Sequence, residues 1–375
     1  MKIMHCITLL DVGGVEGQVL STSNELLRRG HDVRILVLRP PRERSGFRTD
    51  ATILFVGLSK SPLGIVRGLF VALRAVRAFR PDIVHGHSFH ANMFTRLLRM
   101  LERFPYLVNT FHTSCGPRNT LDGGRWHTLA YRMTDFLVDV STNVSKEATE
   151  TFAEARAVPR KKLRTVYDAI DTERFQPSVD CSASLRETFG VREGSFVWLA
   201  VGRLAGPKDY RNLLEAFAAV LQEIPDSLLF VVGDGPDRET LNARVRELSI
   251  EKHVRFLGTR LDVPRLMQCA NAYVLSSAWE GFPNALGEAM SSALPCVSTD
   301  CGGVLELLGN EGWIVPVSDS HALGRRMVEV ASLDRETRVL RGNRARQRVL
   351  ANYSLEKCVA NWLELYGGSR GAKQL

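Results

Sequence analysis

The sequence has no apolar run approaching the ~18–20 residues that cross a membrane. Its first residues lead into Asp11 and a glycine-rich loop, without the small-residue cleavage site of a signal peptide. The 7 cysteines are scattered and form no C-x-x-C pair, so the sequence predicts neither a disulfide framework nor a cysteine zinc site. It also contains no repeat or low-complexity tract. These absences favour a globular protein of a reducing cytoplasm.

Metal ligands are also scarce. No D-x-D pair, which could hold a divalent ion against a diphosphate, occurs in the chain. His85, His87 and His90 lie close together in sequence, but no carboxylate follows at metal-ligand spacing. We therefore expect packed or hydrogen-bonded histidines, no metal and no cofactor.

The positive charge is unevenly distributed. The chain has 49 Lys+Arg and 41 Asp+Glu, a net charge of +8. Residues 1–180 contain 26 basic and 18 acidic residues, whereas residues 181–375 contain 23 of each, so the first half carries the whole excess. Residues 60–105 alone have a net charge of +6. Such a basic region can bind an anionic membrane, although an ordinary solvated helix is an open alternative. The apolar residues of this region are expected mostly in the core; they are Ile65, Leu69, Phe70 and Phe79.

Short apolar runs alternate with amphipathic stretches, which is typical of parallel βαβ units. The alternation restarts near residue 195, and 375 residues suit two domains. We predict two doubly wound Rossmann-like α/β domains, 1–170 and 171–350, with a helix at about 351–375 returning to the first. Residues 171–184 are expected to connect them. Open α/β sheets bind ligands beyond the carboxyl ends of their strands, so the predicted site is a cleft between the domains. The expected strands are 2–9, 33–38, 52–56, 82–86, 106–111, 137–141, 196–201, 227–232, 254–257, 272–276, 295–298 and 313–315.

Two segments of the second half carry charged groups suited to a phosphorylated ligand. Gly202 and Arg203 follow a predicted strand, and Lys208 precedes the next helix. Two cations at a helix N-terminus can bind a diphosphate, although alone they could be solvated surface residues. In the segment from Trp279 to Met290, Glu280 is predicted in a loop and Glu288 inside a helix that Pro283 begins. Because one carboxylate lies before the helix and the other lies inside it, the two can accept hydrogen bonds from separate hydroxyls of one polar ligand. Alternatively, Glu280 caps the helix dipole and Glu288 is a solvated helical residue.

Three further features are weaker when taken singly. Gly13, Gly14 and Glu16 lie between the first strand and its helix, where glycines allow a ligand to approach the backbone. Gly233 belongs to a second glycine turn, and neither loop completes the dinucleotide fingerprint. His112 ends a predicted strand, where it can be either structural or part of a site.

Taken in order, these motifs resemble the retaining, nucleotide-sugar-dependent glycosyltransferases of family four, which have the GT-B fold. The resemblance spans nearly the whole chain, and its most specific part is the Glu-x7-Glu segment. It looks most like members that build surface polysaccharides and lipid-linked oligosaccharides. The sequence departs from the family pattern at two places. At the end of the first domain, the family's Asn-Gly-Ile/Val-Asp reads Asp168-Ala169-Ile170-Asp171, and the Pro-Ser before the first glutamate is Ser276-Ser277.

The resemblance implies a role for each matching position. Arg203 and Lys208 match the diphosphate pair, Glu280 the carboxylate at the donor sugar, and Glu288 the ribose contact. His112 matches the histidine beside the transferred sugar, Gly14 and Glu16 match the loop near phosphate and acceptor, and Arg260 lies in the base-contacting segment. Transfer with retention by front-face attack, with UDP preferred and GDP possible, is implied. The further donor-binding positions implied are Gly202, Gly233, Phe282, Asn284, Ala285 and Leu286.

The predicted function is therefore transfer of a hexose or N-acetylhexosamine from a nucleotide sugar to a glycan or polyprenyl-diphosphate-linked acceptor, in the cytoplasm or at the inner membrane face. A UDP-sugar 2-epimerase has the same architecture but would need no acceptor. A non-catalytic nucleic-acid or membrane-surface binder would use the basic half, but the chain has no basic and aromatic platform for nucleic acid. We expect no nucleic-acid partner.

Overall fold

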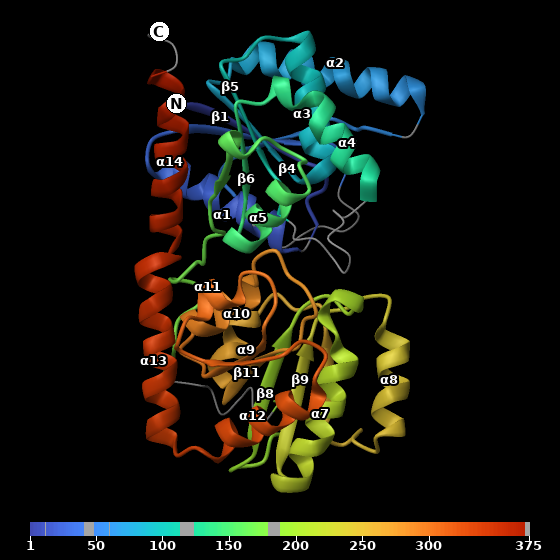
Figure 1. Ribbon diagram of the computed structural model, residues 1–375, viewed down its shortest axis with the longest axis vertical. Coiled ribbons are helices and arrows are strands. Elements are labelled where there is room, and N and C mark those ends of the chain that lie inside the picture. Colours follow the sequence, from blue (N-terminus) through green and yellow to red (C-terminus); the bar gives the residue numbers. More distant parts are fainter. Residues whose placement is uncertain (12, 41–48, 60, 113–123, 179–187, 372–375) are drawn as a thin grey trace. The chain divides into compact units, whose positions relative to one another are not determined.

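A computed structural model describes residues 1–11, 13–40, 49–59, 61–112, 124–178 and 188–371. The chain forms two compact units, one of Met1–Ala169 with Leu355–Leu375 and the other of Ile170–Ser354 (Figure 1). We call them unit 1 and unit 2. No helix in the described ranges is long and apolar enough to cross a bilayer.

Unit 1 is built on a parallel sheet in the order β3-β2-β1-β4-β5-β6-β7. Because the strand order runs outward in both directions from the β1–β4 pair, the loops after these two strands diverge and leave a crevice position between them. The strands are β1 (Lys2–Ile7), β2 (Asp32–Val37), β3 (Thr52–Phe55), β4 (Ile83–His87), β5 (Tyr106–Thr110), β6 (Val140–Asn143) and β7 (Leu163–Thr165).

Helices cover both faces of this sheet, because alternate residues of each strand point to opposite sides. Ile3 and Ile7 pack with α1 (Gly14–Arg28) and α14 (Leu355–Gly371). Met4 and Cys6 pack with α2 (Pro62–Phe79) and α3 (Ser88–Leu101). The other helices of unit 1 are α4 (Gly124–Thr134), η1 (Asp135–Leu137), α5 (Lys146–Glu154) and η2 (Arg160–Lys162).

Unit 2 repeats this plan with a parallel sheet in the order β10-β9-β8-β11-β12-β13. Its core gathers Trp198 and Leu229 of the sheet with Phe217 and Met327 of the covering helices. The strands are β8 (Phe196–Val201), β9 (Ser227–Val232), β10 (Val254–Gly258), β11 (Ala272–Leu275), β12 (Cys296–Thr299) and β13 (Trp313–Val315). The helices are η3 (Gly206–Lys208), α7 (Tyr210–Glu223), α8 (Arg238–Glu247), α9 (Val263–Cys269), α10 (Asn284–Ser291), α11 (Val304–Leu308), α12 (Ser320–Ser332) and α13 (Arg335–Asn352).

The prediction of two Rossmann-like α/β domains is confirmed, with local corrections. The strand expected at 137–141 starts at Val140, because Asp135–Leu137 forms a turn of 3-10 helix. The expected connection is not free chain: Phe175 is buried, and its carbonyl accepts a hydrogen bond from Ser291 at 2.5 Å. Residues 179–184 of that connection lie outside the described ranges, as does Lys60.

The basic region 60–105 also differs from expectation in two ways. Arg96 is buried, where it donates to Asn109 Oδ1 at 2.8 Å and to the Tyr131 carbonyl at 3.0 Å. Ile65 and Phe70 of α2, expected mostly in the core, are exposed, whereas Phe79 is buried. The outer surface of α2 is therefore more apolar than predicted.

Candidate active site

Two loops meet at the point where the strand order of unit 2 reverses. β8 and β11 are neighbours, so the loops after them, which carry Lys208 and Glu280, lie at the same edge of the sheet. The Ala278 amide donates to the Pro207 carbonyl at 2.9 Å, and Ser276 Oγ donates to the Lys208 carbonyl at 2.8 Å. The two loops are thus joined by backbone and side-chain bonds.

This joining brings Lys208 and Glu280 into contact. Lys208 Nζ donates to Glu280 Oε1 at 2.5 Å, and Ser277 Oγ donates to the same oxygen at 2.6 Å. The Glu280 side chain is 12% exposed and that of Lys208 is 23% exposed. Glu280 lies in the loop, as the sequence predicts, and a cation and a carboxylate share one partly solvated position.

Arg203 and Gly202 begin the same loop after β8. The Arg203 side chain is exposed. The Gly202 carbonyl accepts from Tyr210 Oη at 3.2 Å, and burial, helped by the nearby Glu280 charge, raises the pKa of that phenol. Arg203 is therefore free to reach an anion, while the backbone beneath it is fixed.

The glycines of the β9 turn have a structural reason to be glycine. Gly233 has φ +129°, and a Cβ there would lie 2.0 Å from the Gly202 carbonyl oxygen. A Cβ on Gly235 would lie 2.3 Å from the Leu204 carbonyl oxygen. The turn after β9 packs directly against the loop that carries Arg203, which is sufficient to explain Gly233 without a ligand contact.

Helix α10 begins at Asn284, next to Pro283, as predicted. The amides of Asn284 and Leu286 already donate to the Phe282 and Pro283 carbonyls at 2.9 Å. Within the described ranges, no backbone acceptor is present for the Ala285 amide, so this N–H is the one available to a ligand at this helix start.

Glu288 lies inside α10, as predicted. Burial raises its pKa to about 7, because the charged carboxylate loses solvation. Arg174 opposes this rise and Asp171 adds to it, so both side chains are near enough to act on the carboxyl group. Glu288 is therefore easily protonated at neutral pH.

Two predicted donor-binding side chains have other partners. Phe282 is buried, with its ring centre 5.7 Å from that of Tyr353, so its side chain packs into the core and only its backbone is left for a ligand. Arg260 forms a bidentate ion pair with Asp262, with Nε and Nη2 at 2.8 and 2.7 Å from the carboxylate. Its outer face is partly exposed.

In unit 1, the loop after β1 leads directly into α1, which starts at Gly14. The Glu16 carboxylate folds back so far that a Cβ on Gly13 would lie 2.3 Å from Glu16 Oε2. Desolvation raises the pKa of Glu16, and the neighbouring Asp11 charge adds to this. Two acidic groups therefore lie at the crevice position of this sheet.

His112 ends a chain of hydrogen-bonded imidazoles. Its Nε2 is 2.9 Å from His87 Nδ1, and His87 Nε2 is 2.9 Å from His5 Nδ1. His112 Nδ1 lies 3.6 Å from Asp168 Oδ1, and its side chain is 5% exposed. Burial lowers the pKa of His112 to about 3 and that of His5 to about 4. The imidazoles are thus neutral at pH 7. In each hydrogen-bonded pair, one ring donates its N–H to the unprotonated nitrogen of the other.

The histidines that cluster in the structure are not the same three that the sequence groups together. His85 donates or accepts at both nitrogens, 2.7 Å from Tyr366 Oη and 2.7 Å from Thr110 Oγ1, which confirms a hydrogen-bonded role. His90 is not a member, whereas His5 of β1 is. Ligand atoms of His5, His85 and His87 lie within 4.8 Å of one another. His85 uses both nitrogens in the bonds above, and its ring lies against that of His87, with ring centres 4.0 Å apart.

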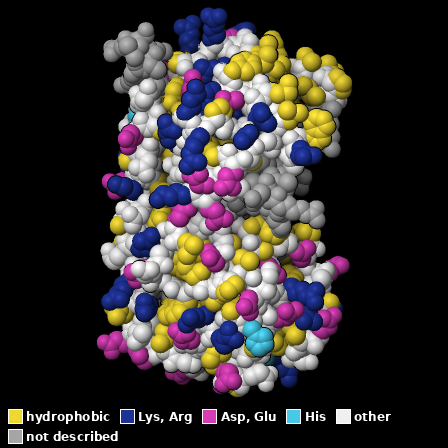
Figure 2. Space-filling model, viewed as in Figure 1, with side chains coloured by type: hydrophobic (Ala, Val, Ile, Leu, Met, Phe, Trp, Pro, Cys, Tyr) yellow, Lys and Arg dark blue, Asp and Glu magenta, His cyan; other side chains and the backbone are white. Residues whose placement is uncertain are grey.

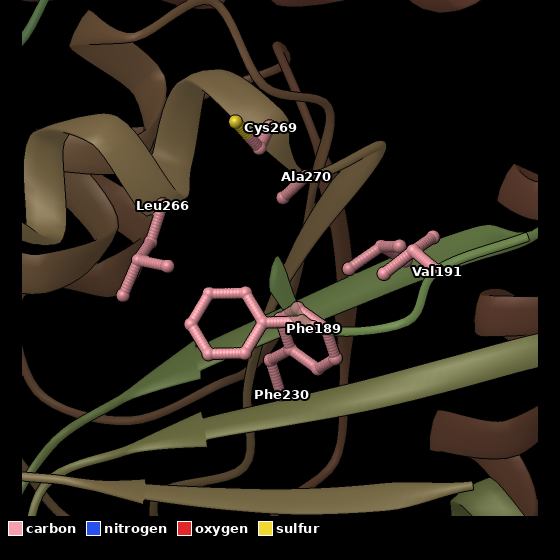
Figure 3. A pocket seen from close by; sticks show the side chains of 7 residues that line it. Phe189, Val191, Phe230, Leu266, Cys269 and Ala270 are labelled. Atoms are coloured by element: carbon pink, nitrogen blue, oxygen red, sulfur yellow. The ribbon is translucent and has the colours of Figure 1, made fainter. Parts of the chain in front are cut away.

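A small pocket in unit 2 is apolar (Figure 3). The rings of Phe189 and Phe230 lie on one side, and Leu266 and Cys269 of α9 lie across from them. It lacks charged groups and is separate from the loops that carry Arg203 and Glu280. We assign it a packing role.

Comparison with known proteins identifies the family of this chain. The model of the Glycosyl transferases group 1 matches residues 182–348, and that of Glycosyltransferase Family 4 matches residues 12–174. Among curated relatives, the N-acetyl-alpha-D-glucosaminyl L-malate synthase of Bacillus anthracis is 31% identical over 76% of this chain and 74% of its own length. The UDP-Gal:alpha-D-GlcNAc-diphosphoundecaprenol alpha-1,3-galactosyltransferase of Escherichia coli is 26% identical over 80% and 79%.

Solved structures show the same fold. Anabaena HepE, crystallised with UDP and glucose, superposes with a TM-score of 0.85 at 19% identity, over 98% of this chain and 100% of that one. WaaG, a glycosyltransferase involved in lipopolysaccharide biosynthesis, gives a TM-score of 0.75 at 19% identity, over 95% and 98%. The fold, together with the family matches, defines a glycosyltransferase of the GT-B type. The chain belongs to glycosyltransferase family 4, with the group 1 domain in its second half.

Proposed function

We propose that this glycosyltransferase moves a hexose or N-acetylhexosamine, with retention and without a metal, from a UDP-sugar to a lipid-linked or glycan acceptor. The observation that carries the proposal is the group formed by Arg203, Lys208 and Glu280 at the point where the sheet order of unit 2 reverses. It combines one exposed guanidinium with a hydrogen-bonded ammonium and carboxylate.

The chemistry needs such an arrangement. Breaking the bond between the sugar and the diphosphate builds negative charge on the leaving oxygens. Lys208 and Arg203 can stabilise this charge without a divalent ion, because both are cations at the start of α7, where the helix dipole adds to them. Glu280 then accepts hydrogen bonds from hydroxyls of the transferred sugar, and Ser277 keeps its carboxylate oriented.

Glu288 is proposed to hold the donor ribose, since its carboxyl group lies in the helix that starts beside Glu280. A raised pKa does not prevent this, because a ribose hydroxyl can either donate to the carboxylate or accept from the neutral acid. The amide of Ala285, the backbone of Phe282 and the outer face of Arg260 remain proposed donor contacts. In unit 1, His112, Gly14 and Glu16 remain proposed contacts of the transferred sugar and acceptor.

The relatives support the choice of donor and acceptor. The Escherichia coli relative is named for a UDP-galactose donor and a diphosphoundecaprenol-linked acceptor, and HepE was crystallised with UDP. A polyprenyl-linked acceptor would place the enzyme at the cytoplasmic membrane face, where the basic first half meets anionic lipid.

A two-stage assay tests the proposal. A thermal-shift screen of UDP- and GDP-sugars comes first, since selective donor binding stabilises the folded state. Mass spectrometry of products on lipid-linked acceptors follows, with and without EDTA, and NMR of the new linkage reports the anomeric configuration. Selective UDP-sugar stabilisation and an EDTA-insensitive, retained product are expected. An inverted linkage, or activity abolished by EDTA, would contradict the mechanism.

Incubation with a UDP-sugar alone provides the control for the same-architecture alternative. A transferase gives no epimer in the absence of an acceptor, whereas a 2-epimerase gives one.

A further inference from the structure

The exposed apolar side chains of unit 1 gather on three successive helical segments. Leu63, Val66 and Phe70 belong to α2, Met100 lies in the last turn of α3, and Trp126 lies in the first turn of α4. Trp126 is 79% exposed and Phe70 is 65% exposed. α2 contacts α3, and α3 contacts α4, so these segments form one surface of unit 1. Figure 2 shows hydrophobic side chains gathered at the upper right, where Figure 1 places α2 and α4.

Helical spacing arranges these side chains in stripes. On α2, Leu63, Val66, Phe70 and Arg74 recur at intervals of three and four residues, so one outward stripe changes from apolar to cationic along the helix. On α4, Trp126, Leu129 and Met133 recur in the same way, with Arg125 and Arg132 beside them. Apolar stripes flanked by arginine and containing tryptophan are typical of surfaces that lie in a membrane interface.

A basic pocket of about 640 Å³ lies at the end of the α4 stripe. Five cations line it, with Asp135 as the only carboxylate among the lining residues. Lys162 pairs with Asp135 at 3.0 Å, and Arg160 pairs with Glu150 at 2.7 Å. Among the residues that the structure describes, no carboxylate pairs with the other three cations of the pocket, Arg132, Arg156 and Lys161.

The pocket is continuous with the apolar surface. Phe136, which lines the pocket and is 75% exposed, follows Met133 at the end of α4. An exposed phenylalanine at the rim fits a lipid phosphate better than a soluble anion, because the acyl chains of a lipid lie beside its head group. The pocket is formed by segments that precede β6 and β7, so it lies at the amino ends of these strands, opposite the edge that carries His112.

We propose that α2, α3 and α4 dock on an anionic membrane and that the pocket between α4 and η2 holds the phosphate of an acidic phospholipid. This inference deepens the proposed membrane contact, which it moves from a general basic region to a defined surface. The apolar stripes enter the interface, and the unpaired cations select anionic lipid.

Vesicle co-sedimentation tests the proposal with the full chain. The wild type should bind vesicles of phosphatidylglycerol and phosphatidylcholine and bind pure phosphatidylcholine weakly, with the difference lost at high salt. The double variant Arg156→Glu/Lys161→Glu should weaken binding to anionic vesicles by about tenfold or more. Trp126→Ser/Phe136→Ser should weaken binding at both low and high salt.

Matched controls lie in unit 2, where Arg344→Glu and Leu340→Ser change exposed residues of the same types. These controls should bind as the wild type does. Equal binding to neutral and anionic vesicles, unchanged binding of the Arg156/Lys161 variant, or competition by inorganic phosphate without vesicle binding would each overturn the proposal.

A second readout separates this inference from the proposed function. Every variant is also tested for thermal stabilisation by the UDP-sugar that shifts the wild type. Retained stabilisation with lost vesicle binding supports the docking surface. Vesicle binding without stabilisation by any nucleotide sugar would contradict the proposed donor and leave the docking surface supported.

Discussion

Lys208 and Glu280 form a hydrogen-bonded ion pair at 2.5 Å, although 72 residues separate them in the chain. The pair depends on the adjacency of β8 and β11 and on the bonds that join their two loops. The cation proposed to meet the diphosphate is therefore held by the carboxylate proposed to meet the sugar. Neither side chain needs to find its position after the donor arrives.

Removing either cation should slow transfer. Arg203→Ala and Lys208→Ala should each lower kcat by about 10²–10³, because each removes stabilisation of the departing diphosphate. Lys208→Ala also leaves Glu280 without its cation. Steady-state kinetics with a nucleotide sugar measure the effect. Arg211→Ala, which removes a mostly exposed cation of α7, is the control and should keep wild-type turnover. Near-normal rates in both variants would contradict the assignment.

The β9 turn should reject any side chain at Gly233. Gly233→Ala should destabilise unit 2 by about 2 kcal/mol or more, because the residue has φ +129° and its Cβ would overlap the Gly202 carbonyl. Gly206→Ala is the matched control, since a Cβ there meets no atom within 4 Å. Urea denaturation compares the two. Equal midpoints would show that the turn yields and that packing does not require this glycine.

Glu288 should make stability fall as pH rises. Its pKa is about 7 in the folded state and 4.5 in the unfolded reference, so the folded state binds the proton more tightly. The stabilisation is complete below about pH 4.5 and is lost as pH rises through about 7, on the order of 3 kcal/mol in total. Glu288→Gln should remove this fall in a series of thermal unfolding curves. Glu239→Gln, an exposed carboxyl of α8, should leave it intact.

The histidine chain should act in the opposite direction. His112 has a pKa of about 3 when folded and 6.5 when unfolded, so the unfolded state binds the extra proton. Its stabilisation is complete above about pH 6.5 and is lost as pH falls toward 3. Several histidines share this behaviour, so unit 1 should be the acid-sensitive part of the molecule.

Replacing one histidine tests this directly. His112→Asn should reduce by about one the number of protons taken up on unfolding near pH 5, measured from the pH dependence of the unfolding free energy. Asparagine suits the position because it tolerates the φ of 57° found there. His321→Asn, an exposed histidine of α12, should leave the proton uptake unchanged.

Local patterns allowed much of unit 2 to be predicted. The position of Pro283 predicts Glu280 in a loop and Glu288 in a helix. Trp198 is predicted in a strand because the short run around it is apolar and ends at Gly202. Phe282 shows the limit of this reasoning. It lies between two site residues in sequence, but its ring packs on Tyr353, a contact that only the tertiary structure creates.

The histidine chain and the exposed apolar side chains of α2 could not be predicted for a related reason. His5 meets His87 because β1 and β4 are neighbours, and no local pattern reports strand order. Ile65 and Phe70 read as core residues because apolar side chains lie on several sides of α2. Their exposure depends on which face the rest of unit 1 leaves uncovered.

The return of α14 to unit 1 has a consequence for the order of folding during synthesis. Tyr366 bonds to His85, and Trp362 packs against the same imidazole, with ring centres 4.7 Å apart. Unit 1 therefore leaves the ribosome first but is completed last, after unit 2 has been made in between. Until then, the face of its sheet that carries Ile3 and Ile7 is covered by α1 alone, and the apolar surface that α14 will bury is exposed to association with other chains.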